Sequence, residues 1–460
     1  MVLGPALIIA AGMVGAACST GPRTEPGAAA PLVASTAPAT TVAGGTDWPT
    51  YHRTLDRAGF SPDTPPVHSL RRAWATTLDG QVYASPLIAG GRVFVATEHN
   101  SVYALDPTTG RVRWHRNVGR PVPLSTLPCG NIDPLGITGT PVYDPTARRV
   151  YAVAETQVNG RVHHDLVGLD AATGKVLLRR SADAPNQDPE PMQQRAALSL
   201  IGGVVYVAYG GLGGDCGDYH GYVAGVPVDK TRPLAVFRVP VGREGGIWAP
   251  PGPAVRVGGA LLVAVGNGDS TTNYDGSDSV TALSVSSLRK TSLFAPKQWR
   301  ADNAADADLG SMGPAPLADG RVVAAGKSGE IYLLSAGKLG GIGGQLARLP
   351  GCRAFGGAAV RANVVYLPCD DGVRQVRIGP GDRLAAGWRT TVATGSPVIG
   401  GGAVWTLNVD DGDLLALDAG SGALRAKTHV GAVTRFATPA MWKSYAFVGT
   451  QAGVVATLVG

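Results

Sequence analysis

Residues 102–114 read Val-Tyr-Ala-Leu-Asp-Pro-Thr-Thr-Gly-Arg-Val-Arg-Trp, and this stretch decides the fold. Alternating apolar residues predict a β-strand, and apolar residues resume after a turn. Asp106 precedes Gly110 by four residues, the spacing of a tight turn in which aspartate accepts backbone N–H groups and glycine takes a positive φ. The same spacing recurs at Asp170 with Gly174 and at Asp418 with Gly422.

A second phrase, a Gly-centred turn followed by an alternating apolar strand, recurs along the chain. Its copies are residues 91–95, 149–153, 203–207, 259–263, 320–323, 363–366, 402–405 and 444–448. They are spaced by about 40 to 60 residues, the period of propeller blades with loop insertions. We therefore expect an all-β fold over residues 47–460, a single eight-bladed β-propeller of four-stranded antiparallel blades. Seven blades is the alternative, if one degenerate copy is spurious.

The last copy, residues 438–459, contains only three plausible strands. Residues 72–78, Arg-Ala-Trp-Ala-Thr-Thr-Leu, precede the first full blade and have the pattern of a strand without partners. We expect this N-terminal strand to complete the last blade, because that closes the ring and removes two exposed edges. Trp74 should then lie beside the final strands.

Composition favours a large all-β chain. Of the 460 residues 44% are hydrophobic and 16% charged, with 65 Gly and 34 Pro. The formal charge is +6, but Lys and Arg are scattered singly. Phosphate recognition needs a contiguous basic surface, so we expect no nucleic-acid partner.

The N-terminal residues predict export. Residues 1–17 are an apolar run too short to span a bilayer, and Cys18 follows them. Residues 15–18, Gly-Ala-Ala-Cys, resemble the bacterial lipobox, in which the cysteine is diacylated, although Gly15 stands where Leu is usual and a basic leader is missing. We expect a signal peptide over 1–18, a disordered Ala/Pro/Thr-rich tether over 19–46, and lipid anchoring at Cys18 to the outer face of the cell membrane. A plain secreted protein is the alternative.

The four remaining cysteines support an oxidising compartment, since an even number can pair. Three pairings are possible, and we favour Cys352 with Cys369 and Cys129 with Cys216, which would join two neighbouring loops. A zinc site is the competing explanation, but the sequence has no C-x-x-C pair and no suitably spaced His.

Four loops are more polar than strand connections require, and blade insertions usually emerge at one end of a ring, around the axial channel. Their binding-face candidates are Asn131, Asp133, Asp215, Asp218, His220, Asp269, Asn273 and Asp275. Asp306 and Asp308 resemble part of a calcium loop, although Leu317 stands where a bidentate Glu is needed. Capping of turns by Asp and Asn is the alternative to a structural Ca²⁺.

Several phrases resemble the repeats of the PQQ-like (pyrroloquinoline-quinone repeat) β-propeller family. They are residues 47–49, 57–59, 83–86 and 102–114. The family includes quinoprotein alcohol dehydrogenases and non-catalytic outer-membrane-assembly lipoproteins. The resemblance implies that a dehydrogenase would need Ca²⁺ held by Glu, Asn and Asp near the axis, an Asp base, a Trp platform and often two adjacent cysteines.

This chain departs from that set, because adjacent cysteines and a C-x-x-C-H haem signature are absent from the sequence. Trp248 or Trp299 could be a platform, but a propeller Trp more often packs between blades. We assign no catalytic residue and expect a monomeric, membrane-held binding or scaffold module for an envelope protein or glycan. A PQQ- and Ca-dependent quinoprotein dehydrogenase with an atypical site is the alternative.

Overall fold

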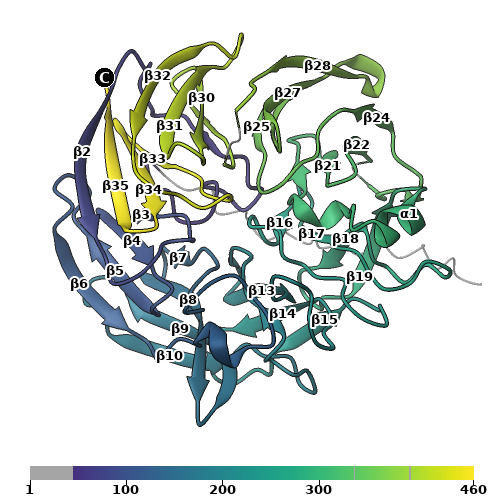
Figure 1. Cartoon of the computed structure of the whole chain (residues 1–460), viewed down its shortest axis with the longest axis horizontal. Coiled ribbons are helices and arrows are strands. Elements are labelled where there is room, and N and C mark those ends of the chain that lie inside the picture. Colours follow the sequence, from purple (N-terminus) through teal and green to yellow (C-terminus); the bar gives the residue numbers. More distant parts are fainter. Residues whose placement is uncertain (1–44, 336, 393–394) are drawn as a thin grey trace, which may run out of the picture. The chain divides into compact units, whose positions relative to one another are not determined.

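The short alternating strands form eight small sheets arranged in a ring (Figure 1). The computed structural model describes residues 45–335, 337–392 and 395–460. The predicted signal peptide, Cys18 and almost all of the predicted tether lie outside the described residues. Each blade runs from an inner strand at the axis to an outer strand at the rim, and the seven-bladed alternative is wrong.

The first four blades follow in chain order. Blade 1 contains β3 (Leu87–Ala89), β4 (Arg92–Ala96), β5 (Ser101–Leu105) and β6 (Val112–Asn117); blade 2 contains β7 (Val142–Asp144), β8 (Arg149–Val158), β9 (Arg161–Asp170) and β10 (Val176–Ser181). Blade 3 contains β12 (Ser199–Ile201), β13 (Val204–Gly211), β14 (Tyr222–Pro227) and β15 (Ala235–Arg238); blade 4 contains β16 (Ala254–Val255), β17 (Ala260–Val265), β18 (Ser279–Ser284) and β19 (Lys290–Ala295).

The other four blades complete the ring. Blade 5 contains β20 (Ala315–Pro316), β21 (Val322–Ala325), β22 (Glu330–Leu334) and β24 (Ala347–Pro350); blade 6 contains β25 (Ala359–Arg361), β26 (Val364–Cys369), β27 (Gly372–Ile378) and β28 (Leu384–Arg389). Blade 7 contains β29 (Val398–Gly400), β30 (Ala403–Asn408), β31 (Asp413–Asp418) and β32 (Leu424–His429); blade 8 contains β33 (Ala440–Trp442), β34 (Tyr445–Thr450), β35 (Gly453–Val459) and β2 (Leu70–Thr77).

Three blades depart from the expected four-stranded antiparallel pattern by an added two-residue strand. These are β11 (Met192–Gln193), antiparallel to β13, and β1 (Phe60–Ser61) and β23 (Gly341–Ile342), parallel to β29 and β19. Helical turns occur only in connections of the described chain: η1 (Leu124–Thr126), α1 (Trp299–Ala304), η2 (Leu309–Ser311) and η3 (Pro380–Asp382). Within residues 45–460 as described, no helix is long and apolar enough to cross a membrane.

The N-terminal strand closes the ring as predicted. β2 pairs antiparallel with β35, the last strand of the chain, from Leu70 opposite Val459 to Thr77 opposite Gly453. Trp74 is buried there, with its ring centroid 5.8 Å from that of Phe447 in β34. The pairing makes β35 an interior strand of blade 8, and β2 becomes the outer strand of that blade.

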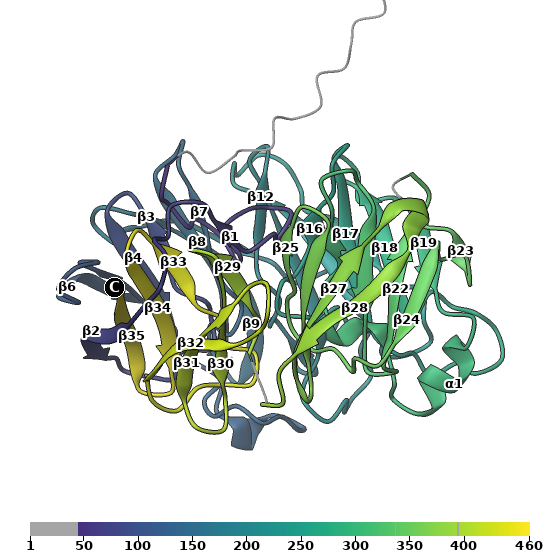
Figure 2. The same ribbon diagram turned by 90° about the horizontal axis from the view of Figure 1, so that it is seen from above.

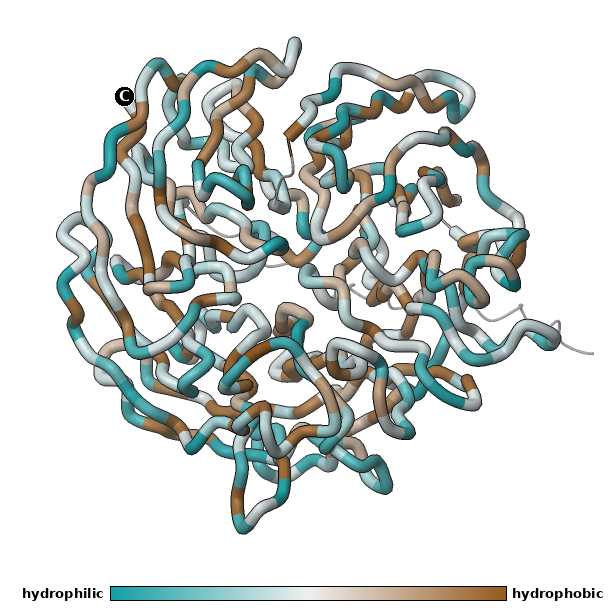
Figure 3. The backbone as a smooth tube through the Cα atoms, viewed as in Figure 1, coloured by the Kyte–Doolittle hydropathy of each residue, from teal (hydrophilic) through white to brown (hydrophobic). Residues whose placement is uncertain are grey.

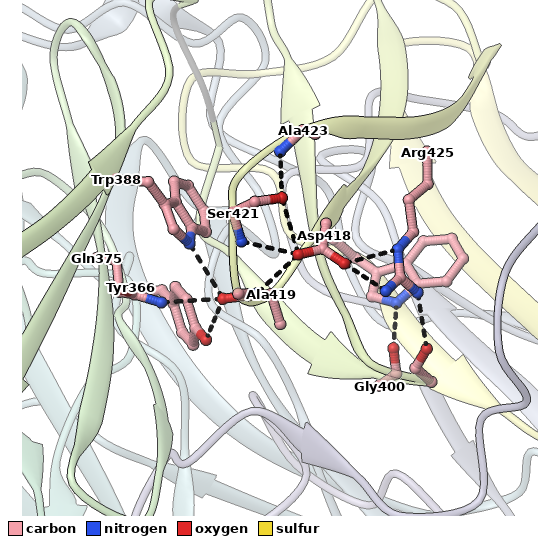
Figure 4. Close-up of polar contacts among 12 residues, drawn as sticks. Tyr366, Gln375, Trp388, Gly400, Asp418, Ala419, Ser421, Ala423 and Arg425 are labelled. Carbon is pink, nitrogen blue, oxygen red and sulfur yellow. Dashed lines mark hydrogen bonds and ion pairs between the residues drawn. The ribbon is translucent and has the colours of Figure 1, made fainter.

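The predicted Asp-to-Gly turns also fasten each blade to its neighbour. In blade 7, Asp418 accepts the N–H groups of Gly420 and Ser421 at 3.0 and 2.7 Å (Figure 4). Trp388 of blade 6 donates its indole N–H to the Ala419 carbonyl at 3.0 Å, and Gly422 has φ +76°. A Cβ at Gly422 would lie 2.6 Å from the Trp388 ring, so the docking requires glycine. Trp74 and Trp114 dock in the same way on the turns of blades 1 and 2.

Apolar side chains fill the spaces between blades, and Figure 3 shows hydrophobic residues running through strands around the whole ring. The largest cluster joins blades 7, 8 and 1 and includes the fully buried Trp48, Trp405 and Phe447. Each small sheet has two apolar faces that it cannot bury alone, which is why the blades stack radially.

A segment before β2 crosses one end of the axis, and we call residues 47–61 the strap. Its backbone bonds to inner strands of several blades, including Trp48 with Ile88, Leu55 with Val255 and Gly59 with Ile399. In Figure 2 the strap, which ends in β1, lies near β7 and β12 at one end of the ring, whereas α1 lies at the other. The strap therefore covers the axis on one side only.

Arg57 fixes the strap to the ring, and its side chain is buried. Its guanidinium donates to five acceptors: Thr50 Oγ1 at 2.6 Å, Tyr51 O at 3.2 Å, Leu198 O at 3.0 Å, Ser199 Oγ at 2.6 Å and Pro253 O at 3.2 Å. Three of these acceptors belong to blades 3 and 4, so one side chain joins strap and blades. The opposite end of the ring is formed by the long connections between strands and blades.

Candidate functional site

The polar loops predicted from the sequence all lie at the end of the ring opposite the strap. Along an antiparallel blade, the connection between the second and third strands and the connection to the next blade emerge at the same end. We call this end the loop face. It contains residues 118–141, 182–198, 212–221, 239–253, 266–278 and 296–314.

The first two loops are joined by the predicted disulfide between Cys129 and Cys216, whose Cα atoms lie 6.1 Å apart. Asn131 is exposed beside this bridge. Asp133 is also exposed, and its Oδ1 accepts the N–H of Leu124 at 3.1 Å. The second predicted disulfide, Cys352 with Cys369, joins the connections of blades 5 and 6.

The cysteine-joined loop of blade 3 uses some of its candidate residues internally. Asp215 Oδ1 accepts the hydroxyl of Tyr219 at 2.5 Å, so this carboxylate orders the loop. His220 is partly exposed and its Nε2 lies 2.9 Å from the Gly242 carbonyl. Asp218 is exposed and makes no hydrogen bond or ion pair within the described chain.

The candidate residues of the blade 4 loop likewise include side chains that order the loop and side chains that are free. Asp275 accepts the N–H and hydroxyl of Ser277 at 3.1 and 2.6 Å, so it caps a turn. The backbone of Asn273 exchanges bonds with the Ser270 hydroxyl, and its side chain is exposed. Asp269 is exposed and has no bonded partner among the described residues. The groups free to meet a ligand are therefore Asn131, Asp218, Asp269 and Asn273.

Asp306 and Asp308 share a lysine. Lys327 Nζ lies 2.5 Å from Asp306 Oδ1 and 2.8 Å from Asp308 Oδ2. Asp306 is exposed, whereas Asp308 is fully buried, and burial raises the pKa of Asp308 to about 6 against the opposing effect of Lys327. The lysine ammonium thus stands beside the oxygens that a Ca²⁺ ion would need.

Two further carboxyls, Asp278 and Asp302, are buried beneath the same loop. Burial and the neighbouring charge of Asp302 raise the pKa of Asp278 well above its usual range. Burial raises the pKa of Asp302 to about 6. Asp278 Oδ1 accepts the Leu309 N–H at 2.6 Å, which ties β18 to the connection that follows α1.

Aromatic and cationic side chains meet across the axis, a feature that the sequence did not indicate. Trp248 follows blade 3 and Phe436 precedes blade 8, yet their ring centroids are 6.1 Å apart. Connections from far sides of a ring can touch only at the axis. Lys327 lies over the Trp248 ring at 5.5 Å, and Arg195 lies over the Phe436 ring at 5.2 Å. Trp299, the other proposed platform, is buried against Tyr274 in the rim loop.

A small hollow lies between this row and the strap. Its wall contains Tyr51 of the strap and Tyr83, Ser85, Thr138, Thr140, Arg195, Pro250 and Phe436 of the connections. The buried Glu98 lies close to Arg195, and burial raises the pKa of Glu98 to about 8. The strap and the connections of several blades therefore meet at this point.

His163 and His164 are adjacent residues of β9, so they point to opposite sides of the strand and do not form a joint site. His164 is fully buried, with Nδ1 2.7 Å from Asp183 Oδ1 and Nε2 3.3 Å from Glu155 Oε2. Burial alone would lower the His164 pKa, but these carboxylates raise it to about 10. His164, Asp183 and Glu155 thus form a buried charged cluster that orders the interior of blade 2.

The repeated sheets can now be compared with known proteins. A family model described as outer membrane protein assembly factor BamB matches residues 70–211. The chain has the eight-bladed β-propeller fold, and its residues 70–211 match a model of PQQ-like repeats. Quinoprotein glucose dehydrogenase of Escherichia coli (strain K12) is 31% identical over 83 residues, a stretch that covers 15% of this chain and 10% of that protein. The shared stretch is thus a small part of that relative.

Solved structures of this fold are similar over most of the ring. Quinohemoprotein alcohol dehydrogenase from Comamonas testosteroni has a TM-score of 0.70 at 17% identity, covering 90% of this chain and 80% of that one. A europium-containing methanol dehydrogenase has 0.69 at 14%, covering 90% and 98%. BamB from Moraxella catarrhalis has 0.56 at 14%, covering 85% and 98%. At these identities the similarity shows the fold alone.

The described residues do not fit a Ca²⁺–quinone centre as they are arranged. No group of three or more His, Cys, Asp or Glu among them is placed to hold a metal ion. Glu244 and Asn267, an acid and an amide near the axis, bond to each other at 3.0 Å, and Arg243 neutralises Glu244 at 2.5 Å. Cys129 bonds to the distant Cys216 instead of an adjacent cysteine.

Proposed function

We propose that this chain is a cell-envelope binding module that holds an envelope protein or glycan on its loop face, in keeping with the predicted export and lipid anchoring. One observation carries the proposal. The carboxylates beside the axis, Glu244, Asp306 and Asp308, are already bonded to Arg243 or Lys327. Asn131, Asp218 and Asp269 project from the surrounding loops. A surface whose internal charges are satisfied and whose loops are joined by a disulfide is preorganised for recognition.

The fold similarity to BamB, whose family description is an assembly factor, supports this proposal. The alternative is a PQQ- and Ca-dependent dehydrogenase. Trp248, Asp308 and Lys327 converge at the axis, and this favours the alternative. Packing of the blades alone does not require charged side chains beside an aromatic ring at that place.

The test uses a triple variant, Asn131→Ala, Asp218→Ala and Asp269→Ala, which removes exposed loop-face groups without breaking a bond that orders the loops. The tagged chain is incubated with detergent-solubilised envelopes and with a glycan panel. We expect the triple variant to lose at least about tenfold in captured partner, because several rim contacts are removed together.

The matched control changes three exposed residues away from the loop face, Asp63→Ala, Arg111→Ala and Lys175→Ala. This control should capture as much partner as the unmodified chain. Equal capture by both triple variants would reject the loop face as the binding surface.

A further inference from the structure

The outer strands of the eight blades form the rim of the ring, and they contain neither Asp nor Glu. β15, β19, β24 and β28 contain one Arg or Lys each, whereas β32, β2, β6 and β10 contain two each. We call the second group of strands the basic rim; its cations are Arg425, Lys427, Arg71, Arg72, Arg113, Arg116, Arg179 and Arg180. Cationic side chains discourage pairing between strand edges, and one per strand serves blades 3 to 6. The doubled charge of blades 7, 8, 1 and 2 exceeds that need.

The four strands of the basic rim form one continuous surface, because they belong to consecutive blades and follow one another along the outside of the ring (Figure 1). Arg72 of β2 donates to the His429 carbonyl of β32 at 3.1 Å. Trp74 docks β2 on the turn that leads into β6. Arg116 of β6 donates to the Gly174 carbonyl, in the turn that leads into β10, at 3.2 Å. The ring therefore gathers on one surface cations that are scattered along the sequence.

Acids of the same blades neutralise only half of these cations. The ion pairs are Arg425 with Asp418, Lys427 with Asp413, Arg113 with Asp106 and Arg179 with Asp165. Among the described residues, no carboxylate pairs with Arg71, Arg72, Arg116 or Arg180. Arg180 donates to the carbonyls of Pro227 and Asp229, whereas the other three arginines are exposed. The basic rim thus keeps an excess of positive charge.

Large apolar side chains are exposed on the same strands. Val112 of β6, Leu177 of β10 and Leu424 of β32 are 40%, 37% and 54% exposed. β15, β19, β24 and β28, which all lie in the described part of the chain, have no exposed large apolar side chain. Apolar groups beside cations suit a bilayer surface, where the apolar groups enter the headgroup region and the cations meet phosphates. A soluble polyanion offers no such place for the apolar groups.

We propose that the basic rim docks edge-on against an anionic phospholipid surface. Its three exposed, unpaired arginines contact lipid phosphates, and its three exposed apolar side chains enter the headgroup region. Guanidinium groups suit phosphate because their N–H donors match the geometry of its oxygens. The rim lies at the side of the ring and the loop face at one end, so this surface is additional to the one that binds a partner in the proposed function.

The test sediments the full chain with vesicles made of equal parts of phosphatidylglycerol and phosphatidylcholine, or of phosphatidylcholine alone. We expect at least about tenfold stronger binding to the mixed vesicles, and loss of this preference at high salt, because salt screens the attraction. Residues 1–17 contain no charged side chain, so any insertion of this apolar run contributes similarly to both kinds of vesicle.

A triple variant removes the unpaired exposed cations: Arg71→Gln, Arg72→Gln and Arg116→Gln. Its affinity for the mixed vesicles should fall by at least about tenfold, since each cation near an anionic surface adds to binding. The matched control removes the same charge from exposed positions on the outer strands of blades 4, 5 and 6: Lys290→Gln, Arg348→Gln and Arg389→Gln. This control should bind as the unmodified chain does.

A second triple variant tests the apolar contribution: Val112→Ser, Leu177→Ser and Leu424→Ser. We expect it to bind the mixed vesicles at least about fivefold more weakly, because less apolar surface enters the bilayer. Unchanged binding would mean that any polyanion suffices, and this overturns the inference. Equal losses in the arginine variant and its control, or equal binding of the unmodified chain to both kinds of vesicle, also overturn it. The comparison of vesicles needs no variant, so it decides the matter even if a variant fails to fold.

Discussion

The strap face and the loop face of the ring differ in regularity. On the strap face, Asp106, Asp170 and Asp418 form the same turn three times, and each receives a Trp from the preceding blade. On the loop face the connections differ in length and sequence, and they are held by unrelated devices: a disulfide, a lysine between two aspartates, and a buried carboxyl pair. The repeated turns therefore stabilise the scaffold, whereas the connections that differ between blades form the candidate site.

The largest expected effect is a loss of stability when the strap is no longer held to the ring. Replacing Arg57 with Ala removes five hydrogen bonds of a buried side chain, so we expect a loss of about 3 kcal/mol or more in the free energy of unfolding. Urea unfolding followed by tryptophan fluorescence measures it. Arg53→Ala is the control within the strap, because Arg53 bonds only to the nearby Gly45 and Phe60 carbonyls and should cost far less. Equal losses would show that the strap is not held through Arg57.

The two disulfides of the loop face should differ in their contributions to stability and to binding. Cys129 and Cys216 are 87 positions apart in the sequence, whereas Cys352 and Cys369 are 17 apart. Removing the first bridge by double Ser substitution should therefore destabilise the chain more, by about 2–4 kcal/mol. Thermal unfolding without reductant checks the order. Only loss of the first bridge should weaken envelope capture, since it alone joins the loops that carry Asn131 and Asp218. Equal weakening by both pairs would contradict the assignment of the site to those loops.

A smaller effect concerns the pH dependence of the loop face. The folded-state pKa values of Asp278 and Asp302 are raised, so the folded chain holds protons that the unfolded chain releases. Their contribution is present below about pH 4 and is lost as pH rises through about 6 and above. Asp278→Asn mimics the protonated acid. Between pH 5 and 8 the free energy of unfolding should therefore decrease by about 1–2 kcal/mol less in this variant than in the unmodified chain.

Urea unfolding at four pH values gives this slope. Asp63→Asn, exposed near the strap, should follow the unmodified chain. Parallel curves for Asp278→Asn and the unmodified chain would mean that the buried pair does not bind the extra proton.

The features that depend on the repeated segments, namely ring closure and the Asp-to-Gly turns, could be predicted from the sequence. Trp74 lies in a segment with the pattern of a strand but no local partner, and the last blade has only three strands of its own. Pairing the two closes the ring and covers the edge that β35 would otherwise expose. Spacing alone indicated the turns at Asp106, Asp170 and Asp418, because the contacts of an Asp-to-Gly turn are local. The cysteine pairs followed from their number and their loops.

The axial site could not be predicted in the same way. Arg195, Trp248 and Phe436 lie in connections that do not repeat, and only closure of the ring brings them together. Lys327 is a single lysine in a short turn, with no local signal that two aspartates some twenty residues earlier bind it. The strap was read as a family phrase, and its crossing of the axis depends on tertiary contacts of Arg57.

The most direct test of the account adds PQQ and Ca²⁺ to the purified chain and follows both the absorbance of the quinone and the reduction of a dye with alcohols and sugars as substrates. The account predicts no saturable spectral change and no turnover, because the acids beside the axis already have cationic partners within the protein. A bound chromophore with dye reduction that disappears in Lys327→Ala would contradict it and establish a dehydrogenase.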